Sequence, residues 1–205
     1  MIFPLITFLL ASSLHLFFTF TSAFYIFPEI SLYPYLITKG LTPYTQLIDQ
    51  HFPSIFFGPF NLSFFSITTP TSALYAFLCV LLLTNLGVLL LLDKSLTKKL
   101  DRVLLFASFI ITYLLLSSGN FWLESFILLF LVWGLYLFKL SSPWAKIISG
   151  LLFGLALGTR PTLLIFFAVF VFLNRKKIGL KFIFASALYP LSQLVWLTAR
   201  KLWGP

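Results

Sequence analysis

The sequence predicts an all-α membrane protein, a polytopic bundle of about six or seven transmembrane helices with a large first loop on the extracytoplasmic side. Hydrophobic residues make up 60% of the 205 residues and charged residues only 9%, whereas a soluble domain carries about 25% charged residues. The apolar residues form long runs, which favour membrane helices over the alternating strands of a barrel. The basic residues gather in short loops between these runs, which is the positive-inside pattern.

The apolar runs place the predicted spans in order along the chain. The first covers residues 2–27, and we expect it to be retained, because no basic segment precedes it as in a cleaved signal peptide. His15 is its ionisable residue, and we expect a neutral, hydrogen-bonded side chain there. Later spans are predicted at residues 72–92, 103–116, 121–138 and 182–198.

The loop DKSLTKKLDR at residues 93–102 is the clearest cytoplasmic segment, because it holds four basic residues directly after an apolar run. Asp93 and Asp101 lie among these cations. We expect both acids to pair locally with neighbouring lysines and arginines and to take no part in catalysis.

Residues 147–173 leave two alternatives open. As one helix they would span about 40 Å at about 1.5 Å per residue, longer than the roughly 30 Å that a membrane core requires. The sequence Leu157-Gly158-Thr159-Arg160-Pro161 interrupts the run at its midpoint. A hairpin of two short helices would bring the basic residues at 139–146 and 175–181 to the same side, as the positive-inside rule prefers. We therefore favour the hairpin, with Arg160 at its extracytoplasmic end.

Residues 27–70 form the large loop, and its polar and aromatic character suits the membrane interface. Pro28 predicts an extended entry, and residues 31–38 predict a short interfacial helix closed by Lys39-Gly40. A turn at residues 42–44 and a second amphipathic piece ending at Gln50 are expected to follow.

Acidic residues in this loop are the candidates for catalysis. Glu29 and Asp49 are two of only five acidic residues in the chain, and acids kept in such a charge-poor membrane protein mark a site by default. Either carboxylate could act as a general base on an acceptor hydroxyl. The alternative is that both are solvated loop acids.

Arg160 is the candidate for binding a phosphate, because its planar guanidinium suits phosphate or carboxylate bidentately. The alternatives are an ion pair with Glu124 or a side chain that reaches the membrane interface. Lys39 is a weaker phosphate candidate. Asp49 and His51 could share a divalent metal, but two ligands are too few to predict one.

Several classes of function are disfavoured by what the sequence contains. The net charge of +9 is explained by cytoplasmic loops, so we expect no nucleic-acid partner. Cys79 is the single cysteine, which excludes a disulfide framework and a thiol metal site. We see no Gly-rich phosphate loop, no zinc-hydrolase helix motif, no nucleophile elbow and no transporter-type repeat.

Two groups of residues carry a resemblance to a known family. In the first loop these are Pro28-Glu29, then Gly40, Pro43 and Tyr44, then Asp49, His51 and Pro53. In the second half they are Gly150, Gly154-Leu155-Ala156 and Thr159-Arg160-Pro161, with Glu124 in the span before them. This pattern resembles the polytopic glycosyltransferases of the GT-C fold, such as the protein O-mannosyltransferases and the aminoarabinose transferases.

The resemblance implies a membrane enzyme that transfers a sugar from a polyprenyl-phosphate donor to a protein, glycan or lipid acceptor. Glu29 or Asp49 would serve as the base, because Pro28 stands where the family has an aspartate. Arg160, Lys39, Tyr44, His51 and Glu124 would lie around the donor and its phosphate. Residues 1–205 would form a single transmembrane domain, and we expect them to be the N-terminal portion of a longer protein.

Two other functions stay open at this point. A flippase or transporter of lipid-linked sugars would place ionisable residues at mid-depth along several spans. A catalytically degenerate membrane scaffold would be consistent with Pro28 at the position of the family's aspartate.

Overall fold

The computed structural model describes residues 2–21, 25–26, 28–47, 67, 69–117 and 120–199. These residues are mostly helical, which confirms the predicted all-α class. In chain order the elements are α1 (Ile2–Thr21), β1 (Tyr25–Ile26), α2 (Pro28–Thr38), α3 (Pro70–Ser95), α4 (Lys99–Ser117), β2 (Asn120–Phe121), α5 (Leu123–Phe138), α6 (Pro143–Thr159), the 3₁₀ turn η4 (Pro161–Leu163), α7 (Leu164–Asn174) and α8 (Leu180–Ala199).

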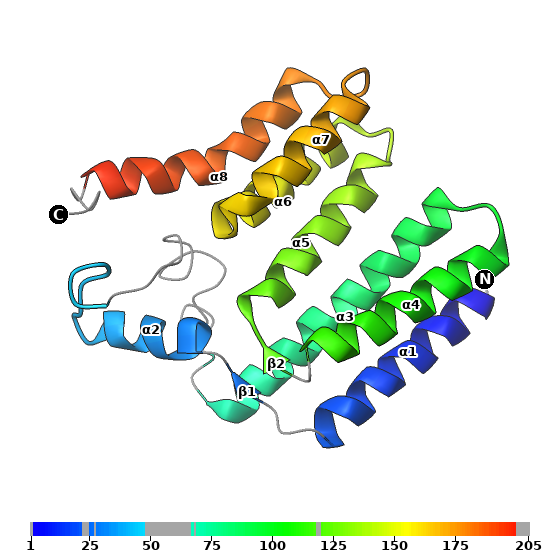
Figure 1. Cartoon of the computed structure of the whole chain (residues 1–205), viewed down its shortest axis with the longest axis horizontal. Helices are drawn as coiled ribbons and strands as arrows, with labels where there is room; N and C mark the ends of the chain where they lie inside the picture. Colours follow the sequence, from blue (N-terminus) through cyan, green and yellow to red (C-terminus); the bar gives the residue numbers. More distant parts are fainter. Residues whose placement is uncertain are drawn as a thin grey trace.

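The long helices lie side by side, with α5 between two groups (Figure 1). On one side of α5, helices α1, α3 and α4 pack on one another; on the other side α6 packs on α5 and α8 packs on α6. Three clusters of buried apolar side chains fill the contacts. They are centred on Phe77 and Phe126, on Val88 and Phe106, and on Phe153 and Phe182.

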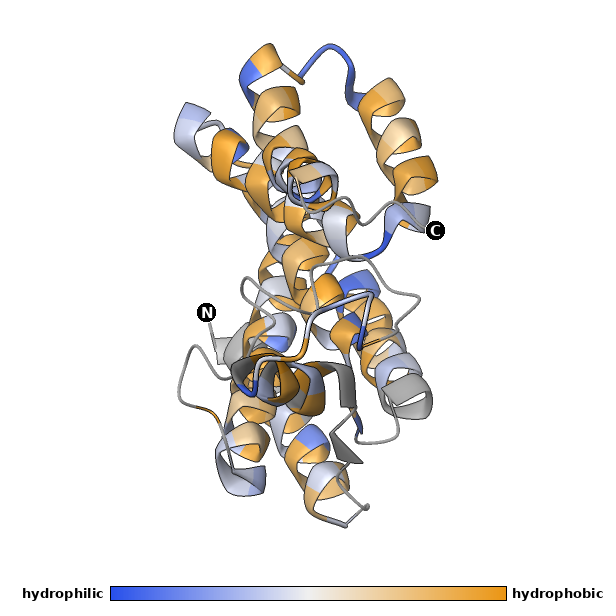
Figure 2. Ribbon diagram, turned by 90° about the vertical axis from the view of Figure 1, so that its left-hand side faces the viewer, coloured by the Kyte–Doolittle hydropathy of each residue, from blue (hydrophilic) through white to orange (hydrophobic). Residues whose placement is uncertain are grey.

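Two of the described helices, α3 and α8, are long and apolar enough to cross a membrane. Helix α3 has 26 residues and contains an 18-residue stretch with a mean hydropathy of 2.4, and α8 has 20 residues and contains an 18-residue stretch with a mean hydropathy of 1.4. The apolar helices α5, α6 and α7 are shorter than a full span. Hydrophobic residues cover most helices, and hydrophilic ones gather in the connections (Figure 2). Exposed side chains such as Ile165 (77%) and Leu173 (73%) give α7 an outer face suited to lipid.

Polar caps fix both ends of α3. At its start, the Thr69 hydroxyl accepts a hydrogen bond from the Ser72 amide at 3.1 Å, and the Ser72 hydroxyl accepts one from the Thr69 amide at 3.0 Å. This is a capping box, which satisfies two amides at the helix start. At its end, Arg102 Nε donates to the Leu96 carbonyl at 2.8 Å and the guanidinium pairs with Asp93. The local pairing predicted for Asp93 is therefore confirmed.

The first helix is shorter than the predicted span at residues 2–27. Helix α1 ends at Thr21, and residues 25–26 pair with residues 120–121 as two short parallel strands. Pairing with another segment requires extended backbone, so the helix cannot continue to Phe27.

The chain reverses between α6 and α7, as the predicted hairpin requires. Arg160 ends α6 with extended backbone angles (φ −130°, ψ 93°), which is the conformation that a following proline favours. Phe153 of α6 then lies against Phe170 of α7, with ring centroids 4.9 Å apart. Farther from the turn, Lys146 Nζ donates to the Lys177 carbonyl at 3.2 Å. The basic residues on either side of the hairpin thus lie at the same end of the bundle.

Three glycines let α6 approach α8 closely. A Cβ atom at Gly150 would lie 2.5 Å from the Phe182 carbonyl oxygen, and one at Gly154 would lie 2.6 Å from the Ser186 carbonyl oxygen. At Gly158 a Cβ atom would lie 2.6 Å from the Tyr189 ring. Spaced four residues apart, these glycines form one helix face of the small-residue type that brings membrane helices together.

We expect Gly154→Ala to destabilise the protein. Alanine is the better helix former by about 1 kcal/mol, but its Cβ atom would collide with the backbone of α8. Thermal unfolding of the purified protein in detergent, followed by tryptophan fluorescence, should therefore show a lower midpoint. The control is Gly179→Ala, where a Cβ atom would meet nothing within 4 Å. A Gly154→Ala variant as stable as the wild type would contradict the close packing.

Candidate functional site

The paired strands carry the starts of α2 and α5 to the same end of the bundle. The strands are parallel, with Ile26 opposite Phe121, and each is followed two residues later by the first residue of a helix. Pro28 is that first residue in α2, so the extended entry predicted there is wrong; a proline fits the first turn of a helix because its missing N–H is not needed there. The backbone of Glu29 lies in this first turn.

Helix α2 and the turn that follows it pack on the bundle. Ile30 and Leu47 are buried in the same cluster as Phe77 and Phe121. The backbone is left-handed at Gly40 (φ 90°), the usual conformation of a glycine just past a helix end, so the predicted helix end at Lys39-Gly40 is confirmed. The turn predicted at residues 42–44 extends to residue 47. The second amphipathic segment predicted to end at Gln50 therefore has no helical residue up to this point.

Two predicted binding residues lie on this segment. The Lys39 ammonium sits 5.4 Å from the centre of the Tyr35 ring, within the range of a cation–π contact. Tyr44 has a left-handed backbone (φ 63°), its amide donates to the Leu47 carbonyl at 2.9 Å, and its partly buried ring packs on the cluster around Phe77. Asp49 and His51 lie outside the described residues, as does the Glu29 side chain.

Arg160 and Glu124 form an ion pair at this same end. An Arg160 terminal nitrogen donates to a Glu124 carboxylate oxygen, which is one of the alternatives that the sequence left open. Glu124 lies in the first turn of α5 and Arg160 caps the end of α6, so each charge also interacts favourably with its helix dipole. The side chains are 38% and 44% exposed, so the pair should add no more than about 1 kcal/mol to stability.

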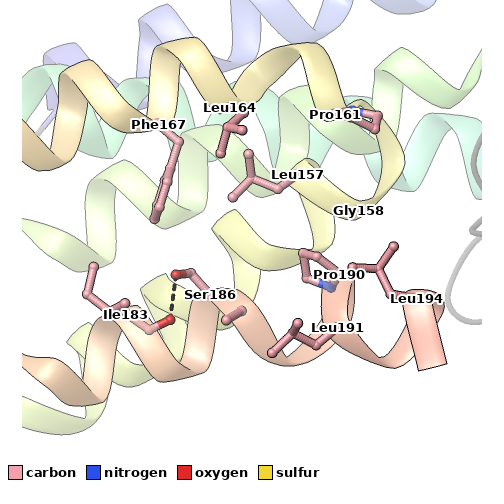
Figure 3. A pocket seen from close by; sticks show the side chains of 11 residues that line it. Leu157, Gly158, Pro161, Leu164, Phe167, Ile183, Ser186, Pro190, Leu191 and Leu194 are labelled. Carbon is pink, nitrogen blue, oxygen red and sulfur yellow. Dashed lines mark hydrogen bonds between the residues drawn. The ribbon is translucent and has the colours of Figure 1, made fainter.

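An apolar cavity lies between α6, α7 and α8 (Figure 3), and Gly158 and Pro161, on either side of Arg160 in sequence, are among its lining residues. Its volume is about 320 Å³. The lining residues are Leu157, Gly158, Pro161, Leu164, Phe167, Ile183, Ser186, Ala187, Pro190, Leu191 and Leu194. The Ser186 hydroxyl donates to the Ile183 carbonyl at 2.8 Å, so even this polar side chain is engaged within its own helix. The cavity therefore suits a hydrocarbon chain.

A buried polar contact inside the bundle was only partly predicted. The Asn85 amide nitrogen lies 2.8 Å from His15 Nδ1, and both residues are 0% exposed. An amide NH₂ can only donate, so Nδ1 accepts, which agrees with the neutral, hydrogen-bonded His15 that the sequence predicts. Asn85 itself was missed, although an asparagine inside a long apolar helix is a signal of a buried polar partner.

Among the described residues, no group of three or more His, Cys, Asp and Glu side chains could hold a metal ion. The metal ligands suggested by the sequence, Asp49 and His51, are not within this part of the chain. Comparison with protein-family models, with curated proteins and with solved structures gives no match to this chain. A proposal for its function therefore rests on its own residues and on the arrangement described above.

We expect Asn85→Leu to destabilise the protein by about 1–3 kcal/mol, because it leaves His15 Nδ1 buried without a partner. Unfolding of the purified protein in a detergent titration measures this loss. The double change His15→Leu with Asn85→Leu removes both polar groups, so it should cost less than Asn85→Leu alone. A double variant that is less stable than the single variant would show that an unpaired His15 Nδ1 is not what destabilises Asn85→Leu.

Proposed function

We propose that this protein is a membrane glycosyltransferase that uses a polyprenyl-phosphate-linked sugar. Two observations support the proposal. The Arg160–Glu124 pair lies at the end of the bundle where α2 begins, and the residues next to it in sequence, Gly158 and Pro161, line an apolar cavity. In this proposal the bundle crosses the membrane about six or seven times, and residues 27–70 lie on the extracytoplasmic side.

The apolar chain of the donor would occupy the cavity, and its phosphate would contact Arg160. An isoprenoid chain is apolar and branched, and the cavity between α6, α7 and α8 is lined by hydrocarbon side chains. The phosphate of such a donor would then lie near Arg160, which follows Gly158 and Thr159 at the end of α6. A guanidinium offers five N–H donors, so contact with one Glu124 oxygen leaves others for a phosphate.

The reaction needs one base and one cation. A carboxylate of the first loop, Glu29 or Asp49, would accept the proton of the acceptor hydroxyl. The hydroxyl oxygen would attack the anomeric carbon of the sugar, and the bond from that carbon to the phosphate oxygen would break. Arg160 would stabilise the negative charge that develops on the departing polyprenyl phosphate. Such electrostatic stabilisation is usually the largest single contribution to the rate enhancement.

Glu124 would act as a positioning residue for Arg160. Its carboxylate holds the guanidinium at the start of α5, where the dipole of that helix favours the acid. Without Glu124 the arginine could swing into solvent, since its side chain is already 38% exposed.

We expect Arg160→Gln to lower sugar transfer by about tenfold or more, because the leaving phosphate loses its cation. The assay measures transfer from a polyprenyl-phosphate sugar in membranes that contain the protein. Arg102→Gln is the matched control, since Arg102 also pairs with one acid, Asp93, but between the first turn of α4 and the end of α3. This control should stay within about twofold of the wild type, as expected of a partly exposed ion pair.

The catalytic acids are tested in the same assay with Glu29→Gln and Asp49→Asn. At least one of these changes should lower transfer about tenfold or more, because a missing general base typically costs that much. If the wild type is active and neither change has this effect, the assignment of the base is wrong. If the wild type transfers no sugar, the proposed function itself is wrong.

A further inference from the structure

The end of the bundle opposite the Arg160–Glu124 pair holds most of the positively charged residues. Residues 94–102 hold four Lys and Arg residues, residues 139–146 hold two and residues 175–181 hold four, which makes ten of the 14 in the chain. The chain reversal at Arg160 brings the second and third of these segments together, and the end of α3 contributes the first. Cations from all three segments therefore lie close together, although the segments are far apart in the sequence.

Among these cations lies a polar pocket of about 440 Å³. Four lysines line it, from three separate segments: Lys94 from the last turn of α3, Lys139 and Lys146 from either side of the α5–α6 connection, and Lys177 from the connection between α7 and α8. The other lining residues are Phe138, Leu140, Ser141, Ser142 and Asn174. The hydrogen bond from Lys146 Nζ to the Lys177 carbonyl, 3.2 Å long, holds two of these segments together.

The start of α6 adds to the positive potential of the pocket. Ser142 is the N-cap residue of this 17-residue helix, and its side chain makes no capping hydrogen bond. The amides of a first helical turn lack partners within the helix, and they favour an anion at that place. Ser141 and Ser142 also line the pocket.

No acid offsets these cations within the described lining of the pocket. The nearest acid in sequence is Asp93, next to Lys94, and its carboxylate pairs with Arg102. Asp101 lies in the first turn of α4, where the helix dipole favours it. Four lysines without an acid among them repel one another, so an anion in the pocket would relieve that repulsion.

We propose that this pocket binds the phosphate group of an anionic phospholipid. Exposed apolar side chains lie within three residues of the lining residues in sequence: Trp144 is 74% exposed, Leu173 is 73% exposed and Leu180 is 76% exposed. A tryptophan at such a place is typical of the membrane interface. A lipid could therefore place its phosphate among the lysines and its acyl chains against these exposed apolar side chains, whereas a free phosphate would use the lysines alone. Basic pockets between membrane helices bind lipid headgroups in this way.

The pocket is distinct from the proposed donor site. Lys146 lies 14 residues before Arg160 on the same helix, which separates the two by about 20 Å along its axis. The lipid site therefore stands whether or not the protein transfers a sugar.

The test compares two triple variants of the purified, detergent-solubilised protein. One changes Lys94, Lys139 and Lys177 to Gln; it removes three charges from the pocket and keeps the hydrogen bond from Lys146 to the backbone of residue 177. The other changes Lys98, Lys99 and Lys176 to Gln; it removes three charges from exposed positions outside the pocket lining. Native mass spectrometry measures bound phosphatidylglycerol, with phosphatidylcholine and inorganic phosphate as the other two arms.

We expect the wild type to bind phosphatidylglycerol more tightly than phosphatidylcholine. The pocket variant should lose affinity for phosphatidylglycerol by about tenfold or more, and the matched variant by about twofold or less. Equal losses in the two variants would show a diffuse charge effect and overturn the site. Equal binding of the two lipids would overturn the anionic preference. If inorganic phosphate displaces the lipid at equal concentration, the proposal that the pocket takes its phosphate group from a lipid is wrong.

Discussion

The reversal of the chain at Arg160–Pro161 is the constraint on which both ends of the bundle depend. Pro161 cannot extend α6, because its ring clashes with the preceding turn and it has no N–H to donate. Its effect on Arg160 is to favour extended backbone, and Arg160 adopts that conformation. The reversal leaves one cation at the end shared with α2 and the start of α5. It also returns the lysines of the α7–α8 connection to those at the start of α6.

Close packing of α6 holds this arrangement together. In the proposed membrane bundle the hydrophobic effect would not drive helices onto one another, so van der Waals contact and hydrogen bonds would decide their association. Gly150, Gly154 and Gly158 bring α6 against the backbone and a ring of α8. On its other side, the Ser149 hydroxyl donates to the Gly134 carbonyl of α5 at 2.6 Å. The same helix therefore shapes the apolar cavity at one end and the lysine pocket at the other.

The sequence predicted the features that follow from composition and from local chain chemistry. Apolar runs and loop charges indicated helices and their order, Gly40 predicted the end of α2, and the Gly158–Pro161 interruption favoured a hairpin. What it did not predict depends on contacts between distant segments. The pairing of residues 25–26 with residues 120–121 shortens α1, and Asn85 meets His15 across 70 positions of sequence. Arg160 could have faced a phosphate or Glu124, because both satisfy a guanidinium; the structure shows the contact with Glu124.

A distance between spin labels on the two arms of the hairpin tests the reversal most directly. Trp144 and Lys176 are both exposed and can be replaced by labelled cysteines after the native, exposed Cys79 is changed to Ala. The reversal predicts a separation below about 30 Å, whereas a continuous helix would hold the two positions about 48 Å apart at about 1.5 Å per residue. A single distance distribution at about 48 Å would contradict the chain reversal. A distribution at the shorter distance would support the reversal on which both proposed sites depend.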